Sequence, residues 1–158
     1  MALRPVDNAD RAALAELRRI GAFPAPLATS PLLAALRCQV VAIEPGTVRL
    51  SFAPGAEFTQ GNGAVAGGIV ATMLDFALAF SVLLELEPGE SAASVSLAVH
   101  FLAPVSPAPL SAPLSSPLSA QGRVLRMGRR IAHAEAELRD EQGLLLATAQ
   151  SPLALRRD

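Results

Sequence analysis

The chain has 158 residues, a formal net charge of −1 and a single cysteine, Cys38. This length suits one domain with a real hydrophobic core, and a charge so close to zero argues against a nucleic-acid-binding protein. A lone cysteine excludes an internal disulfide and is compatible with a reducing compartment. The N-terminus lacks the basic segment and apolar run of a secretory signal. We therefore expect one domain over residues 1–158, located in the cytoplasm.

Residues 1–30 are predicted to form an N-terminal helix and a linker. Over residues 10–20, Ala and Leu alternate with Arg and Glu at helical spacing, and Gly21 supplies a stop signal. Ser30 and Pro31 then match the cap and the first position of a second short helix. We expect the first helix to cover a sheet edge or an entrance.

Apolar and polar residues alternate in several later segments, as they do in half-buried β-strands. Turn sequences containing Gly46, Gly128 and Gly143 separate neighbouring segments. The expected strands cover residues 38–43, 47–52, 92–101, 122–127, 131–139 and 144–155. The sequence thus predicts an antiparallel sheet of five or six strands.

Residues 104–120 are rich in Pro, Ser and Ala and contain the tripeptide Pro-Leu-Ser three times. Proline cannot donate a hydrogen bond to a β-ladder, so this segment is predicted to be an exposed loop. A proline-rich ligand for a partner domain is the alternative.

The most apolar segment is 67–84, in which Asp75 is the only charged residue. Strong helix formers dominate it and a proline follows it, so we expect a buried helix of about five turns. A membrane span needs about 20 apolar residues. The charge at the centre and the absence of flanking Lys or Arg argue against such a span.

Asp75 is the first candidate for a functional side chain. An ionised carboxylate removed from water without a partner costs several kcal/mol. Asp75 is therefore expected to be paired, neutral or facing a solvated cleft. A structural position at a partly wet edge of the helix is the alternative to a functional role.

The residues around the helix start resemble a known signature. Residues 60–68 read QGNGAVAGG, and Asp75 follows. This run resembles hotdog-fold thioesterases of the PaaI-like, 4-hydroxybenzoyl-CoA thioesterase type, which show Asn, a Gly three residues later, His-Gly-Gly at the helix start and an Asp or Glu nine residues after the His. The resemblance extends over residues 31–155. It implies an α+β hotdog fold, with the antiparallel sheet wrapped around one long buried helix, and hydrolysis of acyl-CoA thioesters.

The resemblance assigns roles to individual residues. Gly67 would offer its backbone N–H as an oxyanion hole, where the positive end of the helix dipole favours developing negative charge. Asp75 would be the nucleophile or the base that activates water, and Ser94 matches a position where some members place a hydroxyl near that water. Gln60 takes the place of an Asn that positions the thioester. Ala66 replaces the usual His and has no hydrogen-bonding side chain. Substrate contacts are implied for Gly68, Ala66, Asn62, Arg129 and Arg130.

The resemblance implies no metal and no cofactor, since coenzyme A is part of the substrate. Neither His100 nor His133 belongs to a zinc-ligand spacing. Arg129 and Arg130 lie in an arginine-rich hairpin, which either contacts the phosphates of coenzyme A or is an ordinary charged turn. The ordinary turn is the favoured interpretation. Ala66 also leaves a second function open, that of a catalytically weak or inactive acyl-CoA-binding protein.

Gly67 and Asp75 are eight residues apart in the sequence, which is about 12 Å along a helix. Both groups must lie within about 3 Å of one reacting group or its water, so one helix cannot supply both. We therefore expect a homodimer with shared active sites, or a dimer of two such dimers. Acyl-CoA is the expected ligand, and neither nucleic acid nor a membrane is an expected partner.

Overall fold

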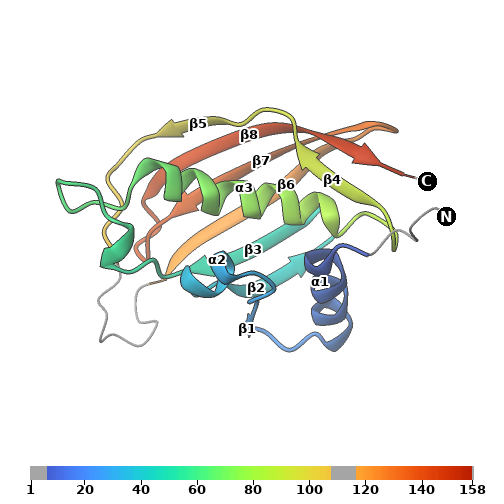
Figure 1. Cartoon of the computed structure of the whole chain (residues 1–158), viewed down its shortest axis with the longest axis horizontal. Helices are drawn as coiled ribbons and strands as arrows, with labels where there is room; N and C mark the ends of the chain where they lie inside the picture. Colours follow the sequence, from blue (N-terminus) through green and yellow to red (C-terminus); the bar gives the residue numbers. More distant parts are fainter. Residues whose placement is uncertain (1–6, 108–116, 158) are drawn as a thin grey trace.

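The computed structural model describes residues 7–107 and 117–157. The strands form one antiparallel sheet in the order β1-β2-β3-β6-β7-β8-β4, and β5 also pairs with β8. They are β1 (Ala25–Pro26), β2 (Gln39–Glu44), β3 (Thr47–Phe52), β4 (Ser91–Ser94), β5 (Ala98–Phe101), β6 (Leu118–Met127), β7 (Ile131–Arg139) and β8 (Leu145–Arg156). The helix α3 (Gly67–Leu83) lies along one face of this sheet (Figure 1). This is the α+β arrangement that the sequence predicts. The described residues form eight strands, whereas five or six were predicted, because β1 was not expected and one predicted strand is divided in two.

Local capping signals set the ends of the two N-terminal helices, α1 (Ala9–Ile20) and α2 (Pro31–Ala35). The side chain of Asn8 accepts hydrogen bonds from two N–H groups of the first turn of α1. Gly21 ends α1 in the left-handed conformation, with φ of 69°, which glycine adopts at little cost. Ser30 caps α2 by accepting one hydrogen bond, from the Leu33 N–H. These ends match the predictions within one or two residues.

The first helix, α1, is tied to the C-terminal end of α3. Arg18 Nη1 donates a 3.1 Å hydrogen bond to the carbonyl oxygen of Leu84, a favourable place for a cation because it is the negative end of the helix dipole. Asp7 forms an ion pair with Arg11 and accepts a 3.3 Å hydrogen bond from the Gly89 N–H. The helix thus covers one end of α3, whereas the sequence predicted that it covers a sheet edge or an entrance.

The predicted strand 92–101 is divided into the two strands β4 and β5. Ser94 and Ala98 are four residues apart, whereas their partners on β8, Leu153 and Gln150, are only three residues apart. The edge therefore carries one extra residue between β4 and β5. Pro152 lies opposite this gap. Its carbonyl oxygen accepts a 2.9 Å hydrogen bond from the Val95 N–H, but proline has no N–H with which to continue the ladder. The interruption therefore comes from the partner strand.

The strand β6 begins at Leu118, four residues before the predicted start. The end of segment 104–120 is therefore strand, which corrects the prediction of a loop there. Leu118 pairs with Phe52 of β3 and is buried, so pairing with a neighbouring strand extends β6 into the Pro- and Ser-rich sequence. Two Pro-Leu-Ser copies fall within residues 108–116, outside the described residues.

Small residues let α3 lie close to the middle of the sheet. Ala120, Ala134 and Ala136 are fully buried or nearly so. A Cβ atom on Gly122 would lie 1.9 Å from the carbonyl oxygen of Ala77 in α3, which is closer than any two such atoms can approach. Larger apolar side chains fill the rest of the core: Val48, Leu50, Phe52, Met73, Leu74, Leu78, Leu138 and Leu153. Each such buried side chain stabilises the fold by about 1.5–3 kcal/mol.

The opposite side of α3 is only partly covered in a single chain. Thr72, Asp75, Phe76 and Ala79 share this side at helical spacing and are half-buried. The prediction of a buried helix is therefore confirmed only for the side of α3 that faces the sheet. The other side carries the one charge of the helix.

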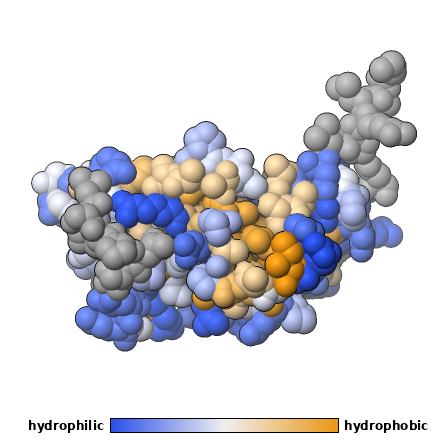
Figure 2. All heavy atoms as spheres, turned by 90° about the horizontal axis from the view of Figure 1, so that it is seen from below, coloured by the Kyte–Doolittle hydropathy of each residue, from blue (hydrophilic) through white to orange (hydrophobic). Residues whose placement is uncertain are grey.

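The face below α1 and α2 mixes apolar and charged side chains. Figure 2 shows apolar side chains near the middle of this face and hydrophilic ones toward both ends. Ile20 and Leu32 are exposed apolar residues of these helices, and Arg19 pairs with Glu16 at 2.6 Å. Within the described residues, none of the helices has the length and apolar character needed to span a membrane.

Candidate active site

Asp75 lies in the middle of α3 and is hydrogen-bonded to Ser94 of β4. The Ser94 Oγ donates to Asp75 Oδ1 at 2.7 Å. Ser94 pairs with the buried residue Leu153 of β8, and side chains of paired residues point to the same side of a sheet, so Ser94 faces α3. The carboxylate is thus paired and reachable by solvent, as the cost of burying a charge requires.

The first turn of α3 presents backbone N–H groups at the N-terminal end of this helix. Ala66 is the N-cap, and it makes no side-chain hydrogen bond to the turn. Its carbonyl oxygen accepts from the N–H groups of Ile69 and Val70. Within residues 7–107 and 117–157, the structure records no acceptor for the N–H groups of Gly67 and Gly68. These two groups are available to a ligand, at the positive end of the helix dipole.

A pocket of about 400 Å³ opens beside this helix start. Gln60 and Asn62 are its polar side chains, and Gly67 also lines it. The apolar lining includes Val65, Val70, Phe101, Leu102, Pro104 and Val105. The loop before the helix is held by a 2.8 Å hydrogen bond from the Val65 N–H to the Val105 oxygen. A pocket of this size, mostly apolar with a few polar groups, is typical of a small-molecule site.

Asn62 serves the loop itself as well as the pocket. Its Oδ1 accepts a 3.2 Å hydrogen bond from the Ala64 N–H, while Gly63 takes a φ of 83° that favours glycine. The Gln60 side chain is exposed. The predicted residues Gln60, Asn62 and Gly67 thus meet at one pocket, with Gly68 and Ala66 next to it.

Asp75 and Ser94 do not line this pocket. They form a second group farther along α3, as the helical rise between Gly67 and Asp75 predicts. One chain therefore holds two separate parts of the predicted site. Nothing within the described residues brings them together.

Arg129 and Arg130 are exposed in the turn between β6 and β7. The neighbouring residue Ile131 pairs with Ala154 near the end of β8, whereas Gly67 lies beside the start of β8, at Phe101. The two arginines are thus at the opposite end of the sheet from the pocket of the same chain (Figure 1). Arg123 of the same hairpin forms an ion pair with Glu135, so the hairpin offers fewer unpaired cations than its sequence suggests.

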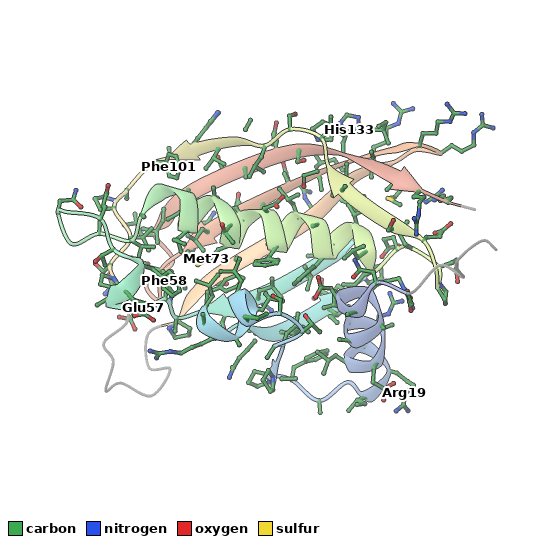
Figure 3. The ribbon with its side chains drawn as sticks, in the orientation of Figure 1. Arg19, Glu57, Phe58, Met73, Phe101 and His133 are labelled. Carbon is green, nitrogen blue, oxygen red and sulfur yellow. The ribbon has the colours of Figure 1, made fainter. Side chains whose placement is uncertain are left out.

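The other reactive side chains lie outside this site. Burial raises the pKa of the Cys38 thiol to about 12, which leaves almost no thiolate for nucleophilic attack. His100 and His133 are exposed, and Figure 3 shows His133 far from the start of α3. The described residues hold no cluster of three or more side chains that could bind a metal ion.

Sequence reasoning missed the closeness of Phe101 to the helix start. A Cβ atom on Gly67 would lie 3.3 Å from Cζ of the Phe101 ring, and the ring lines the pocket. Figure 3 places Phe101 beside the first turn of α3. No local signal in the sequence could reveal this neighbour, because it lies on another element.

The model of the thioesterase superfamily, 4HBT, matches residues 62–147, which is more than half of the chain. The chain belongs to the thioesterase superfamily. No curated protein matches the sequence.

Solved structures confirm the hotdog fold. A phenylacetic acid degradation-related protein from Ralstonia eutropha JMP134 is 26% identical, covers 93% of this chain and 99% of its own, and superposes with a TM-score of 0.74. The PaaI protein from the phenylacetic acid degradation operon of E. coli is 15% identical over 94% of both chains, with a TM-score of 0.72. A Streptococcus mutans UA159 protein bound to acetyl CoA is 15% identical over 74% of this chain and 86% of its own, with a TM-score of 0.65.

Proposed function

We propose that this protein hydrolyses an acyl-CoA thioester to a free acid and coenzyme A. The observation that carries the proposal is the Asp75 carboxylate, which accepts a hydrogen bond from Ser94 on the half-exposed side of α3. The same helix begins with two available N–H groups at a pocket. Membership of the thioesterase superfamily supports thioester hydrolysis. Coenzyme A as the carrier is supported by the Streptococcus mutans structure, whose protein binds acetyl CoA.

In the proposed reaction the thioester carbonyl oxygen accepts a hydrogen bond from the Gly67 N–H. Asp75 removes a proton from water, and the water oxygen attacks the carbonyl carbon. The tetrahedral intermediate carries negative charge on the oxygen at Gly67, where the helix dipole stabilises it. Cleavage of the carbon–sulfur bond then expels the thiolate of coenzyme A, which takes up the proton. Direct attack by the Asp75 carboxylate, followed by hydrolysis of the mixed anhydride, is the alternative course.

The proposed site needs a second copy of the chain, because Gly67 and Asp75 are separated by about 12 Å of helical rise. The sheet edge formed by β4 and β5 supports this assembly. Residues 91–101 carry no proline and neither Asp, Glu, Lys nor Arg, so this edge lacks the charges and prolines that often prevent pairing with another strand. In a symmetric dimer with antiparallel α3 helices, Asp75 and Ser94 of one protomer face the partner's Gly67.

Subunit mixing tests the activity and the shared site together. Asp75→Asn removes the carboxylate, and Gly67→Pro removes the N–H. Proline suits this position because Gly67 is the first residue of α3 and Ala66 before it is extended, with φ of −60° and ψ of 140°. Each variant alone is expected to be inactive toward acyl-CoA.

Dimers that contain one chain of each variant are expected to hold one intact site. Random mixing should therefore restore about a quarter of the wild-type thiol release. Gly67→Ala retains the N–H and measures the effect of a side chain alone, whose Cβ would lie 3.3 Å from Cζ of Phe101. Mixtures that stay inactive, although purification through a different affinity tag on each variant recovers mixed dimers, would rule out the shared site.

The second candidate function is acyl-CoA binding without turnover. It rests on Ala66, which caps α3 without any side-chain hydrogen bond and offers no polar group to the substrate. Saturable binding of acyl-CoA by the wild-type protein, with no thiol released from short, medium, long or aryl substrates, would favour this function over hydrolysis.

A further inference from the structure

Phe101 is the largest side chain that lines the pocket, and it is unusually exposed for an aromatic residue, at 58%. Its ring points with its tip toward Gly67. A Cβ atom at that position would lie 3.3 Å from Cζ and 3.5 Å from Cε1. The ring therefore occupies the space beside the Cα atom of Gly67, the residue whose N–H the proposed reaction uses.

The backbone that carries this ring is held in place on β8. Phe101 pairs with Ala147 as the last residue of β5. The next two N–H groups, of Leu102 and Ala103, both donate to the carbonyl oxygen of Leu146, at 2.8 and 3.1 Å. The position of the Phe101 backbone is thus set by the sheet.

We propose that Phe101 selects the acyl group by its width at the carbon next to the carbonyl. This inference rests on the proposed function. A carbonyl oxygen that accepts a hydrogen bond from the Gly67 N–H lies about 3 Å from that nitrogen. In the proposed binding mode the acyl side of the thioester, and not the sulfur side, faces the ring, so the carbon next to the carbonyl lies beside the ring tip. A straight chain has only hydrogen atoms to place there, whereas a branched or ring-bearing carbon places an additional heavy atom against Phe101.

The selected substrate class is accordingly straight-chain acyl thioesters, in preference to those branched at the second carbon and to benzoyl thioesters. A single additional carbon in a tight apolar site changes kcat/KM by about 10–200-fold. The preference concerns the width of the acyl group near the carbonyl. The rest of the pocket determines which acyl-chain lengths fit.

The test compares butyryl-CoA with isobutyryl-CoA and benzoyl-CoA as substrates for the full chain. The wild-type protein is expected to prefer butyryl-CoA by at least about tenfold in kcat/KM. Phe101→Ala is expected to reduce that preference about tenfold or more, and Phe101→Leu to reduce it less. Ile20→Ala is the matched control, since Ile20 of α1 is also an exposed apolar residue and does not line the pocket.

The outcomes separate this inference from the proposed function. If the wild-type protein releases thiol and Phe101→Ala keeps the wild-type preference, the inference is wrong and the proposed function stands. If the wild-type protein releases no thiol, the proposed function fails. In that case the dissociation constants of the three ligands decide the inference. Tighter binding of butyryl-CoA by the wild type, lost in Phe101→Ala, supports it. The same ratios of dissociation constants in the wild type and in Phe101→Ala overturn it. Sedimentation of both variants shows whether the substitutions change the assembly.

Discussion

The Ser94 hydroxyl donates a 2.7 Å hydrogen bond to Asp75 Oδ1, which joins the edge strand β4 to the middle of α3. The two residues are 19 positions apart in the sequence. The contact gives the only charged side chain of α3 a hydrogen-bond partner. Among the described residues, the second carboxylate oxygen of Asp75 has no hydrogen-bond partner. A carboxylate that is oriented and still accessible is suited to act on water.

Replacing Asp75 by Asn is expected to lower kcat by roughly 10²–10⁴-fold if the carboxylate acts as base. The amide retains an oxygen that can accept from Ser94, so the shape of the site is preserved. The melting temperature should not fall, because a neutral amide costs less to keep in a half-buried position than a charge does. Thiol release and thermal unfolding measure the two effects. Full activity in this variant would show that Asp75 has no part in the chemical step.

Replacing both Arg129 and Arg130 by Ala is expected to raise the KM for acyl-CoA at low salt and to affect it less at high salt. Exposed arginines attract phosphate groups through a field that salt screens, with a Debye length of about 10 Å at 0.1 M. In the proposed dimer, with antiparallel α3 helices, this hairpin lies toward the pocket of the partner chain and not toward the pocket of its own chain. Arg19→Ala on α1 is the control. An unchanged KM at low salt would mean that the hairpin is an ordinary charged turn.

Replacing Gly122 by Ala is expected to destabilise the fold by about 3 kcal/mol or more, at the upper end of the cost of overpacking a core. The new Cβ would lie 1.9 Å from the Ala77 carbonyl oxygen, and both groups belong to packed backbone that cannot easily move. Gly61→Ala is the matched control, since no atom lies within 4 Å of its Cβ position. Denaturant unfolding of the two variants measures the difference. Equal stability would contradict the close approach of β6 to α3.

The attachment of α1 is expected to weaken in acid. The hydrogen bond from Arg11 lowers the pKa of Asp7 from 3.8 to about 2. Because the pKa is lower in the folded chain, the stabilisation is fully present above about pH 4 and is lost as the pH falls toward 2. The difference in melting temperature between the wild type and Asp7→Asn should therefore shrink from pH 5 to pH 2. A constant difference would show that Asp7 does not stabilise the fold through its charge.

Local signals in the sequence were sufficient for much of the fold. The helix cap at Ser30, the alternation in β3 and β7 and the glycine turn at Gly46 depend on residues within a few positions of each other. The spacing between a helix start and a carboxylate, interpreted through a family resemblance, also predicted roles for Gly67 and Asp75. These features are visible in sequence because their physical causes are local or because spacing along one helix is fixed.

The remaining features depended on contacts between distant segments, which no local pattern records. Pro152 of β8 interrupts the predicted strand 92–101, and pairing with β3 extends β6 back to Leu118. In the same way, the ring of Phe101 reaches Gly67 only because β5 and the start of α3 meet in space. The sequence alone determined which residues are chemically able to act, because that depends on side-chain type and spacing. Only the tertiary structure decided which of them touch, because strand pairing and packing place residues together irrespective of their separation along the chain.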